Sequence, residues 1–216
     1  MSLLETAGGA QGRICASPGT VALTFDDGPD PEWTARVLAE LGRHGASATF
    51  FVEAPRALAH PDLIKAMSAA GHEVGFHCVQ HVRHSQLSDG ALAAEAAEGL
   101  EILGWLGVRP TAWRAPWGEV TAATRRVASA HGLELWGWSF DSHDWRGDDR
   151  EQMLSALEAE GGLGDGTVAL MHDGLGPGSR RECCTETVRL TAALLEAAAE
   201  AGLRVAPLSN RPAPAS

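Results

Sequence analysis

Short apolar segments alternate with longer, amphipathic, alanine-rich segments along almost the whole chain. The short segments have the length of buried strands, and the longer ones carry apolar residues at helical spacing. This alternation predicts an α/β fold in which parallel strands are joined by crossover helices. The expected strands cover residues 20–25, 48–52, 73–77, 111–114, 133–140, 167–171 and 204–207. The expected helices cover residues 31–44, 61–70, 89–105, 121–131, 150–160 and 185–201.

Seven units of this kind favour a closed or nearly closed barrel over an open sheet, although periodicity alone leaves closure open. The chain has 216 residues, 44% of them hydrophobic and 21% charged, which suits one globular domain with a full core. We expect that domain over residues 19–210, an N-terminal extension over 1–18 and a loose C-terminal tail over 211–216. No second domain or linker is visible, and the oligomeric state is not predicted.

The charge balance disfavours several classes of partner. The formal net charge is −11, and Lys65 is the single lysine. An acidic chain of this kind disfavours nucleic acid, anionic membrane surfaces and polyanionic glycans, but it is compatible with neutral substrates. Residues 1–12 lack the basic and apolar regions of a signal peptide, and no apolar run is long enough to span a bilayer. The compartment is not predicted: the protein would be cytoplasmic as the chain stands, and extracytoplasmic if a leader has been removed.

Asp26 and Asp27 are adjacent carboxylates directly after the first expected strand. Two carboxylates are costly to hold close together unless a cation binds there. One interpretation is a metal ion with one carboxylate as ligand and the other free to act as a base. The alternative is an ordinary surface turn, because Asp-Gly-Pro is common turn chemistry.

The other polar clusters also follow the expected strands, and this distribution separates the two interpretations. In a barrel of parallel strands, chemistry collects at the carboxyl ends of the strands. Polar residues of an ordinary surface would be scattered along the chain and would not gather after the strands. The clusters after the third to sixth strands are His77, His81 and His84; Arg114; Asp141, His143 and Asp144; and His172 with Asp173.

Two histidines four residues apart, His77 and His81, share a face if the segment turns helical and can then bind one ion. With Asp27 they form a two-histidine, one-carboxylate set, which leaves open positions for water and substrate. His84 offers an alternative pairing with His81. For an isolated pair, histidines on a polar loop are the simpler interpretation.

Arg114 is an arginine among apolar residues and needs a carboxylate, for which Asp26 is the obvious candidate. The alternative is a rim arginine stacked on a tryptophan. His172 is a candidate general acid held by Asp141 or Asp144, between which the residues alone do not decide, and the alternative is a satisfied core histidine. Trp117 and Trp145 lie beside these residues and are candidates for stacking on a sugar.

Taken in order, these segments resemble the polysaccharide deacetylase family, also called the NodB homology domain or carbohydrate esterase family 4. The resemblance covers nearly the whole chain, from Thr24 to Asp173. It rests on five motifs: Thr24-Phe25-Asp26-Asp27-Gly28, His77-x-x-x-His81, Arg114-x-Pro116-Trp117, Asp141-x-x-Asp144-Trp145 and Leu170-x-His172. One such short motif would be weak evidence for a family, but five of them in the same order are strong evidence. The resemblance implies a distorted (β/α)7 barrel and metal-dependent removal of N- or O-acetyl groups from glycans.

The same resemblance implies a role for each motif residue. It makes Asp26 the general base and Arg114 the residue that orients it. It makes His172 the general acid, with Asp141 as its carboxylate partner. The backbone N–H of Trp117 is implied as the oxyanion contact. The implied ligands of a divalent metal, zinc first and cobalt, nickel or manganese as alternatives, are Asp27, His77 and His81.

Two positions depart from the family pattern. Cys78 stands where the family usually has Ser or Thr, which affects the shape of the loop, and Trp117 stands where tyrosine is common. The expected substrate is an acetylated glycan such as a chitooligosaccharide, peptidoglycan or acetylxylan. Two alternatives stay open: a deformylase or amidohydrolase acting on a small acetylated or formylated amide or a lipid-linked sugar, and a catalytically inactive glycan-binding barrel.

Overall fold

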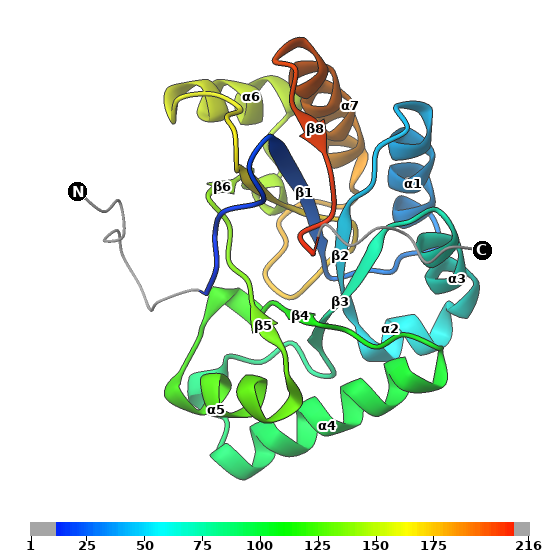
Figure 1. Cartoon of the computed structure of the whole chain (residues 1–216), viewed down its shortest axis with the longest axis vertical. Helices are drawn as coiled ribbons and strands as arrows, with labels where there is room; N and C mark the ends of the chain where they lie inside the picture. The colour runs from blue at the N-terminus through cyan, green and yellow to red at the C-terminus, as the bar shows by residue number, and fades with distance from the viewer. Residues whose placement is uncertain (1–11, 210–216) are drawn as a thin grey trace.

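The computed structural model describes residues 12–209, in which parallel strands form one curved sheet enclosed by helices (Figure 1). The strands are β1 (Thr20–Asp26), β2 (Thr49–Glu53), β3 (Glu73–Cys78), β4 (Ala112–Trp113), β5 (Glu134–Leu135), β6 (Phe140–Asp141), β7 (Val168–His172) and β8 (Arg204–Val205). The helices are α1 (Trp33–Arg43), α2 (Ala54–Ala59), α3 (Pro61–Ala69), α4 (Asp89–Trp105), α5 (Ala122–His131), α6 (Arg150–Ala159) and α7 (Thr185–Glu200). The 3-10 turns are η1 (His84–Gln86), η2 (Pro116–Gly118) and η3 (Asp144–Arg146).

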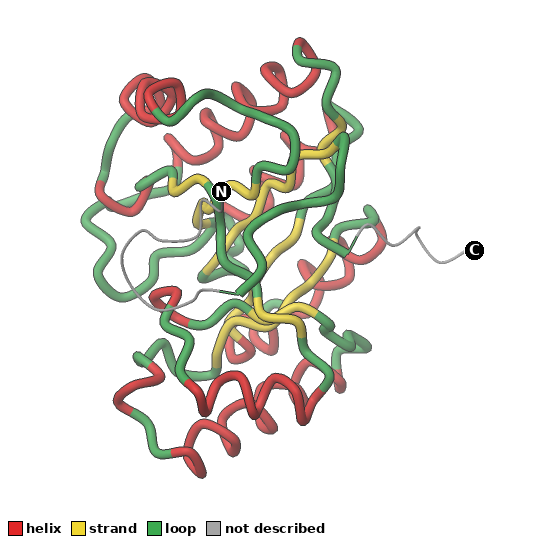
Figure 2. The backbone as a smooth tube through the Cα atoms, turned by 60° about the vertical axis from the view of Figure 1, so that its left-hand side comes forward, coloured by secondary structure: helices red, strands yellow, loops and turns green. Residues whose placement is uncertain are grey.

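The strand order is β5-β4-β3-β2-β1-β7-β6, with β8 paired to the first two residues of β1. Every pairing is parallel, so the carboxyl ends of the strands meet at one end of the sheet. The helices lie outside the strands in both views (Figures 1 and 2). This confirms the α/β class and the distorted (β/α)7 barrel in a single domain.

The fifth expected strand, residues 133–140, is two short strands in the structure. Trp136 still donates its backbone N–H to the carbonyl oxygen of Trp113 in β4, whereas Ser139 donates its own to that of Val168 in β7. The chain therefore changes hydrogen-bonding partners between these two residues, and a continuous strand cannot pair with both edges at once. This segment runs from one edge of the sheet, at β5, to the other edge, at β6.

The helices follow the predicted pattern, and residues 89–105 match it at both ends. Ser88 caps α4 by accepting from the backbone N–H of Ala91, and Thr121 forms a capping box with Thr124 at the start of α5. Gly132 ends α5 in the left-handed conformation, where glycine carries no steric cost. Helix α2 was not predicted, because its six residues are too few to show helical periodicity.

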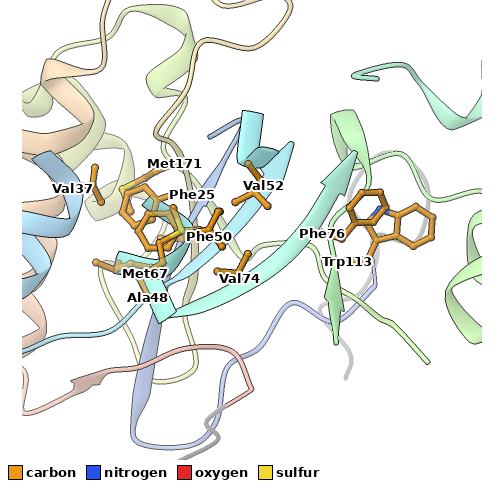
Figure 3. Packing of buried hydrophobic residues seen from close by; sticks show 14 of the residues in the cluster. Phe25, Val37, Ala48, Phe50, Val52, Met67, Val74, Phe76, Trp113 and Met171 are labelled. Atoms are coloured by element: carbon orange, nitrogen blue, oxygen red, sulfur yellow. The ribbon is translucent and has the colours of Figure 1, made fainter. Parts of the chain in front are cut away.

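The hydrophobic core lies between the sheet and the helices (Figure 3). Phe25 of β1 and Phe50 of β2 stack with ring centroids 5.1 Å apart, and Met67 of α3 packs beside them. Farther along the sheet, the rings of Phe76 and Trp113 pack together in the same cluster. All of β1 is buried, so the polar residues at its end are held by rigid surroundings.

The expected tail at 211–216 and most of the expected extension at 1–18 lie outside the described residues. Within the described part of that extension, Arg13 and Ala16 donate backbone hydrogen bonds to Leu135 and Gly166. No helix between residues 12 and 209 is long and apolar enough to cross a membrane.

Candidate active site

A cavity of about 320 Å³ opens at the carboxyl ends of the strands. Most of the predicted site residues line it, although they come from five different segments of the chain. The cavity is lined by Asp26, Asp27, His77, His81, Arg83, Trp117, Gly118, Trp138, Asp141, Trp145, Leu170, His172, Gly174, Gly176, Pro177, Gly178, Ser179 and Arg181. The tertiary structure therefore brings together the motifs that the sequence separates by up to 146 positions.

Asp27, His77 and His81 form a compact group at one side of this cavity, in which Asp27 and His77 are buried and His81 is partly buried. Asp27 follows β1 with a left-handed backbone, His77 lies in β3, and His81 lies in the loop after it. Asp27 Oδ1 is 3.4 Å from Nε2 of His77 and 3.3 Å from Nε2 of His81. One potential ligand atom from each residue lies within 4.8 Å of the others, a spacing that a single ion can bridge.

The chemistry of this group fits a divalent cation. Asp27 Oδ1 is buried and has no hydrogen-bond partner, and an orphaned carboxylate oxygen is costly unless a cation meets it. His77 Nδ1 lies 2.7 Å from the carbonyl oxygen of Arg114. A carbonyl only accepts, so Nδ1 carries the hydrogen and Nε2 keeps a lone pair for a metal.

The electrostatics of the group favour positive charge. Burial alone raises the pKa of Asp27, but the imidazoles of His77 and His81 hold that pKa well below its usual range. Burial lowers the pKa of His77, and the charges of Asp26 and Asp27 more than offset this, so the net shift is upward. Two carboxylates thus concentrate negative potential where the three ligand atoms converge.

His84, the alternative partner of His81, lies elsewhere. It is buried against the ring of Trp113, and its Nδ1 is 2.9 Å from the hydroxyl of Thr124. Burial lowers the pKa of His84 to about 4. The structure therefore leaves His77 and His81 as the histidine pair beside Asp27.

Asp26 is held by Arg114. The Arg114 guanidinium is fully buried, and its NH1 donates to Asp26 Oδ1 at 2.9 Å and to the Thr24 hydroxyl at 2.7 Å. Its NH2 donates to the carbonyl oxygen of Gly137 at 2.7 Å. These three hydrogen bonds hold the guanidinium in place, and the guanidinium in turn fixes the direction of the Asp26 carboxylate.

His172 is held by Asp144, and the expectation that Asp141 would be its partner is wrong. His172 Nδ1 lies 2.7 Å from Asp144 Oδ1, and the backbone N–H of His172 donates to Asp144 Oδ2 at 2.9 Å. Asp141 instead accepts the backbone N–H of His143 at 2.8 Å. The left-handed backbone of His143 turns the chain, so that Asp144 and not Asp141 points at β7.

The Asp144 pairing sets the protonation of His172. Burial lowers the pKa of His172, but the Asp144 carboxylate dominates and raises it to about 9. Burial raises the pKa of Asp144, yet His172 and Arg181 together hold it well below its usual range. His172 is therefore a cation at neutral pH, and Nε2 is the nitrogen left to face a substrate.

Trp117 and Trp145 stand at the cavity as expected. Trp117 is 43% exposed and has a left-handed backbone with φ of 61°. The rings of His81 and Trp117 meet edge to face with their centroids 5.1 Å apart, and the Arg83 guanidinium lies 4.7 Å from the Trp117 ring centroid. Backbone strain of this kind on a non-glycine residue is common where a peptide group is positioned for function.

A glycine-rich segment, residues 174–178, packs directly on the site. A Cβ atom on Gly176 would lie 2.0 Å from Asp27 Oδ2, and one on Gly178 would lie 2.9 Å from the Trp117 ring. This close approach requires glycine. The sequence showed the glycines, but it did not show that they lie against the carboxylate.

Sequence reasoning did not single out three residues around the cavity, namely Arg83, Trp138 and Arg181. Arg181 is the one that contacts the candidate acid, because it donates to Asp144 and to the carbonyl oxygen of His172. It belongs to none of the motifs, and an arginine in a loop is ordinary surface composition, so no signal distinguished it.

Asp173 is a second buried carboxyl beside the site. The backbone N–H of Asp173 donates to the carbonyl oxygen of Asp26 at 3.2 Å, and the Thr34 hydroxyl donates to its carboxylate. A Cβ on Gly28 would collide with that carboxylate. Burial raises the pKa of Asp173 to about 7. Asp173 therefore stabilises the turn that carries Asp26 and Asp27.

Comparison with known proteins agrees with this geometry. The polysaccharide deacetylase family model matches residues 13–136. The chain is 31% identical over 209 residues to a peptidoglycan-N-acetylglucosamine deacetylase of Bacillus cereus, covering 96% of this chain and 94% of that protein. It is 34% identical over 199 residues to a chitooligosaccharide deacetylase of Bradyrhizobium, covering 88% and 89%.

A solved structure leads to the same family. A family 4 carbohydrate esterase from Streptomyces lividans in complex with acetate superimposes with a TM-score of 0.76 at 30% identity, covering 88% of this chain and 92% of that one. The family match spans more than half of the chain, and the sequence relatives span nearly all of it. The chain belongs to the polysaccharide deacetylase family and is thus a hydrolase of carbon–nitrogen bonds other than peptide bonds.

Proposed function

We propose that this protein removes N-acetyl groups from a glycan of the chitooligosaccharide or peptidoglycan type, with O-acetyl groups as a secondary substrate. One observation carries the proposal. A candidate base held by an arginine, a candidate acid held by a carboxylate and a three-ligand metal group face one cavity. The named activities of the relatives from Bacillus cereus and Bradyrhizobium support the choice of substrate class.

Asp27, His77 and His81 would hold the metal, with zinc as the first candidate and cobalt, nickel or manganese as alternatives. Two imidazoles and one carboxylate are a donor set that zinc commonly takes in hydrolases. When bound there, a divalent ion supplies a Lewis acid next to the acetyl carbonyl and lowers the pKa of a water.

Asp26 takes the proton of the attacking water. The Arg114 guanidinium, 2.9 Å from Asp26 Oδ1, keeps that carboxylate in one orientation and stabilises its charge. The backbone N–H of Trp117, at the cavity wall, donates to the oxyanion that forms on the acetyl carbon. Such a positioned donor is worth on the order of 10²–10³-fold in rate.

His172 donates a proton to the departing nitrogen of the sugar. An amine is a poor leaving group unless it is protonated, so this step decides whether the intermediate collapses to products. Asp144 orients the imidazole through Nδ1 and keeps it charged at neutral pH. General acid or base assistance of this kind contributes typically about 10²–10⁴-fold.

The cavity suits a single sugar residue. Its volume of about 320 Å³ is at the small end of the range for small-molecule sites. Trp117 and Trp145 present indole rings at its wall, and aromatic rings stack well on the apolar faces of sugars. The net charge of −11 favours a neutral glycan over an anionic one.

The test measures acetate release from a panel of N-acetylglucosamine oligomers, peptidoglycan fragments and acetylated xylan, each with and without a chelator. We expect chelator-sensitive release from at least one N-acetylated glycan, and loss of that release in metal-loaded Asp26→Asn. A small N-formyl amide belongs in the panel, because turnover of it alone would favour the deformylase alternative. Binding of an oligosaccharide without any acetate release would instead identify an inactive glycan-binding barrel.

A further inference from the structure

Arg181 is a buried arginine that the proposed reaction does not yet use. Its NH1 donates to Asp144 Oδ2 at 2.8 Å, and its NH2 donates to the carbonyl oxygens of His172 at 2.8 Å and of Gly174 at 3.4 Å. The Arg181 side chain is only 7% exposed, and that of Asp144 is fully buried. A buried guanidinium with this many directed contacts holds its partners in place.

The two oxygens of Asp144 serve different groups. Oδ1 meets Nδ1 of His172, whereas Oδ2 accepts from the His172 backbone N–H, from Arg181 and from the Thr187 hydroxyl at 2.7 Å. One negative charge is thus shared between two cations, the imidazolium and the guanidinium. Each cation is stabilised less by a shared carboxylate than by one of its own.

We propose that Arg181 is a positioning residue for the reaction, which fixes Asp144 and limits how tightly that carboxylate retains the proton on His172. The inference rests on the proposed function, because it assigns His172 to donate a proton. Within the described residues, the hydrogen bonds of Arg181 go to Asp144, to Thr187 and to backbone carbonyl oxygens, and none goes to the three candidate metal ligands. It acts through Asp144 and through the carbonyl oxygen of His172 itself.

The charges around His172 explain why a limit is needed. Asp144 of η3 and the two carboxylates Asp26 and Asp27 at the end of β1 all favour the charged imidazole, while burial opposes it. Arg181 is the cation that packs against the same carboxylate from the segment before α7. An acid transfers its proton best when its pKa is near the working pH, so an Asp144 carboxylate that served His172 alone would make His172 too weak an acid.

The experiment compares Arg181→Gln and Arg181→Lys with a matched control, Arg180→Gln. Arg180 is the exposed neighbour of Arg181, and its recorded contact is a backbone hydrogen bond to the Trp145 carbonyl oxygen, which the substitution keeps. The control removes the same charge one position away. Each variant is assayed from pH 6 to pH 10 on an N-acetylglucosamine oligomer and on 4-nitrophenyl acetate, whose leaving group needs no proton.

For Arg181→Gln we expect kcat on the oligomer to fall by about 10- to 100-fold, with KM within about 3-fold of wild type. The rate of hydrolysis of the aryl ester should stay within about 3-fold of wild type. The basic limb of the oligomer profile should move to higher pH by about one unit, because Asp144 then serves His172 alone. Arg181→Lys keeps a cation on Asp144 but loses the second arm of the fork. The Arg181→Lys variant should keep the basic limb of the pH profile in place and lose less activity than Arg181→Gln. The control Arg180→Gln should match wild type.

Equal losses on the oligomer and the ester, with no movement of the basic limb, would identify Arg181 as structural and overturn the proposal. Unchanged kinetics would also overturn it. If Arg181→Gln does not fold, the comparison of Arg181→Lys with Arg180→Gln on the two substrates decides. Titration of the ¹⁵N-labelled His172 ring by NMR tests the proposal apart from the function. If wild type releases no acetate, the proposed function fails. The effect of Arg181 on His172 can still be tested, because a ring pKa that rises in Arg181→Gln supports it and a ring pKa that does not rise contradicts it.

Discussion

His172 Nδ1 lies 2.7 Å from Asp144 Oδ1, while Asp141, three residues earlier, accepts the backbone N–H of His143 in its own turn. This pairing decides which carboxylate supports proton donation. The two aspartates belong to one motif, and both lie near the cavity, so only their contacts distinguish them. Asp144 is fully buried and its charge is paired with His172, whereas Asp141 is partly exposed at the wall of the cavity.

Replacing Asp144 by Asn should remove the charge that keeps His172 protonated. We expect kcat on an N-acetylated oligomer to fall by about 10²-fold, and the basic limb of the pH profile to move to lower pH. The matched variant Asp141→Asn should leave the basic limb where it is. Steady-state kinetics between pH 5 and pH 10 measure both effects. A larger shift for Asp141→Asn than for Asp144→Asn would contradict the pairing.

The raised pKa of His172 has a consequence for stability. Its pKa is about 9 in the folded protein and about 6.5 in an unfolded chain. A group with a raised folded pKa adds stability that is fully present below pH 6.5 and is lost as the pH rises through about 9. The unfolding free energy of wild type relative to His172→Gln should therefore shrink across this window. Urea denaturation at intervals from pH 6 to pH 9.5 measures it, and a difference that grows with pH would refute the assignment.

Metal content should separate two buried histidines that lie seven residues apart. His77→Ala should lose the metal, because it removes one of three ligands, whereas His84→Ala should keep it, because His84 contacts Thr124 and Trp113 instead. Asp26→Asn should keep the metal and lose turnover by about 10²–10⁴-fold. Elemental analysis after dialysis measures occupancy. Full occupancy in His77→Ala would refute the ligand assignment.

Arg114 should matter for stability far more than an exposed arginine. Arg114→Ala leaves Asp26 buried without its partner, which should cost about 3–5 kcal/mol. Arg126→Ala breaks an exposed ion pair with Asp89 and should cost less than about 1 kcal/mol. Chemical denaturation monitored by tryptophan fluorescence compares them. Similar losses in both variants would show that Arg114 does not carry the buried charge of Asp26.

Two glycines on helix α4 should respond in opposite directions to the same substitution. A Cβ on Gly99 would lie 2.3 Å from the Phe76 ring, so Gly99→Ala should destabilise the protein by about 1–3 kcal/mol. Nothing lies within 4 Å of a Cβ on Gly104, so Gly104→Ala should stabilise it by about 0.5–1 kcal/mol through helix propensity. Thermal unfolding measures both, and a stabilised Gly99→Ala would contradict the packing of α4 on β3.

The local parts of this protein follow from its sequence. The apolar run of β1 predicts a buried strand, and the periodicity of residues 89–105 predicts α4 with the observed bounds. The position of Asp26 and Asp27 after that strand places two carboxylates where parallel strands end. These features depend on neighbours within a few residues, and such short-range preferences are what periodicity and capping residues record.

The tertiary structure alone decided which distant residues meet. It set His84 against Thr124, turned Asp144 instead of Asp141 toward His172, and brought Arg181 onto the same carboxylate. It also divided residues 133–140 between the two edges of the sheet. The reason is physical: these contacts join side chains up to 40 positions apart, and their geometry depends on backbone turns, such as the left-handed His143, that no local pattern encodes.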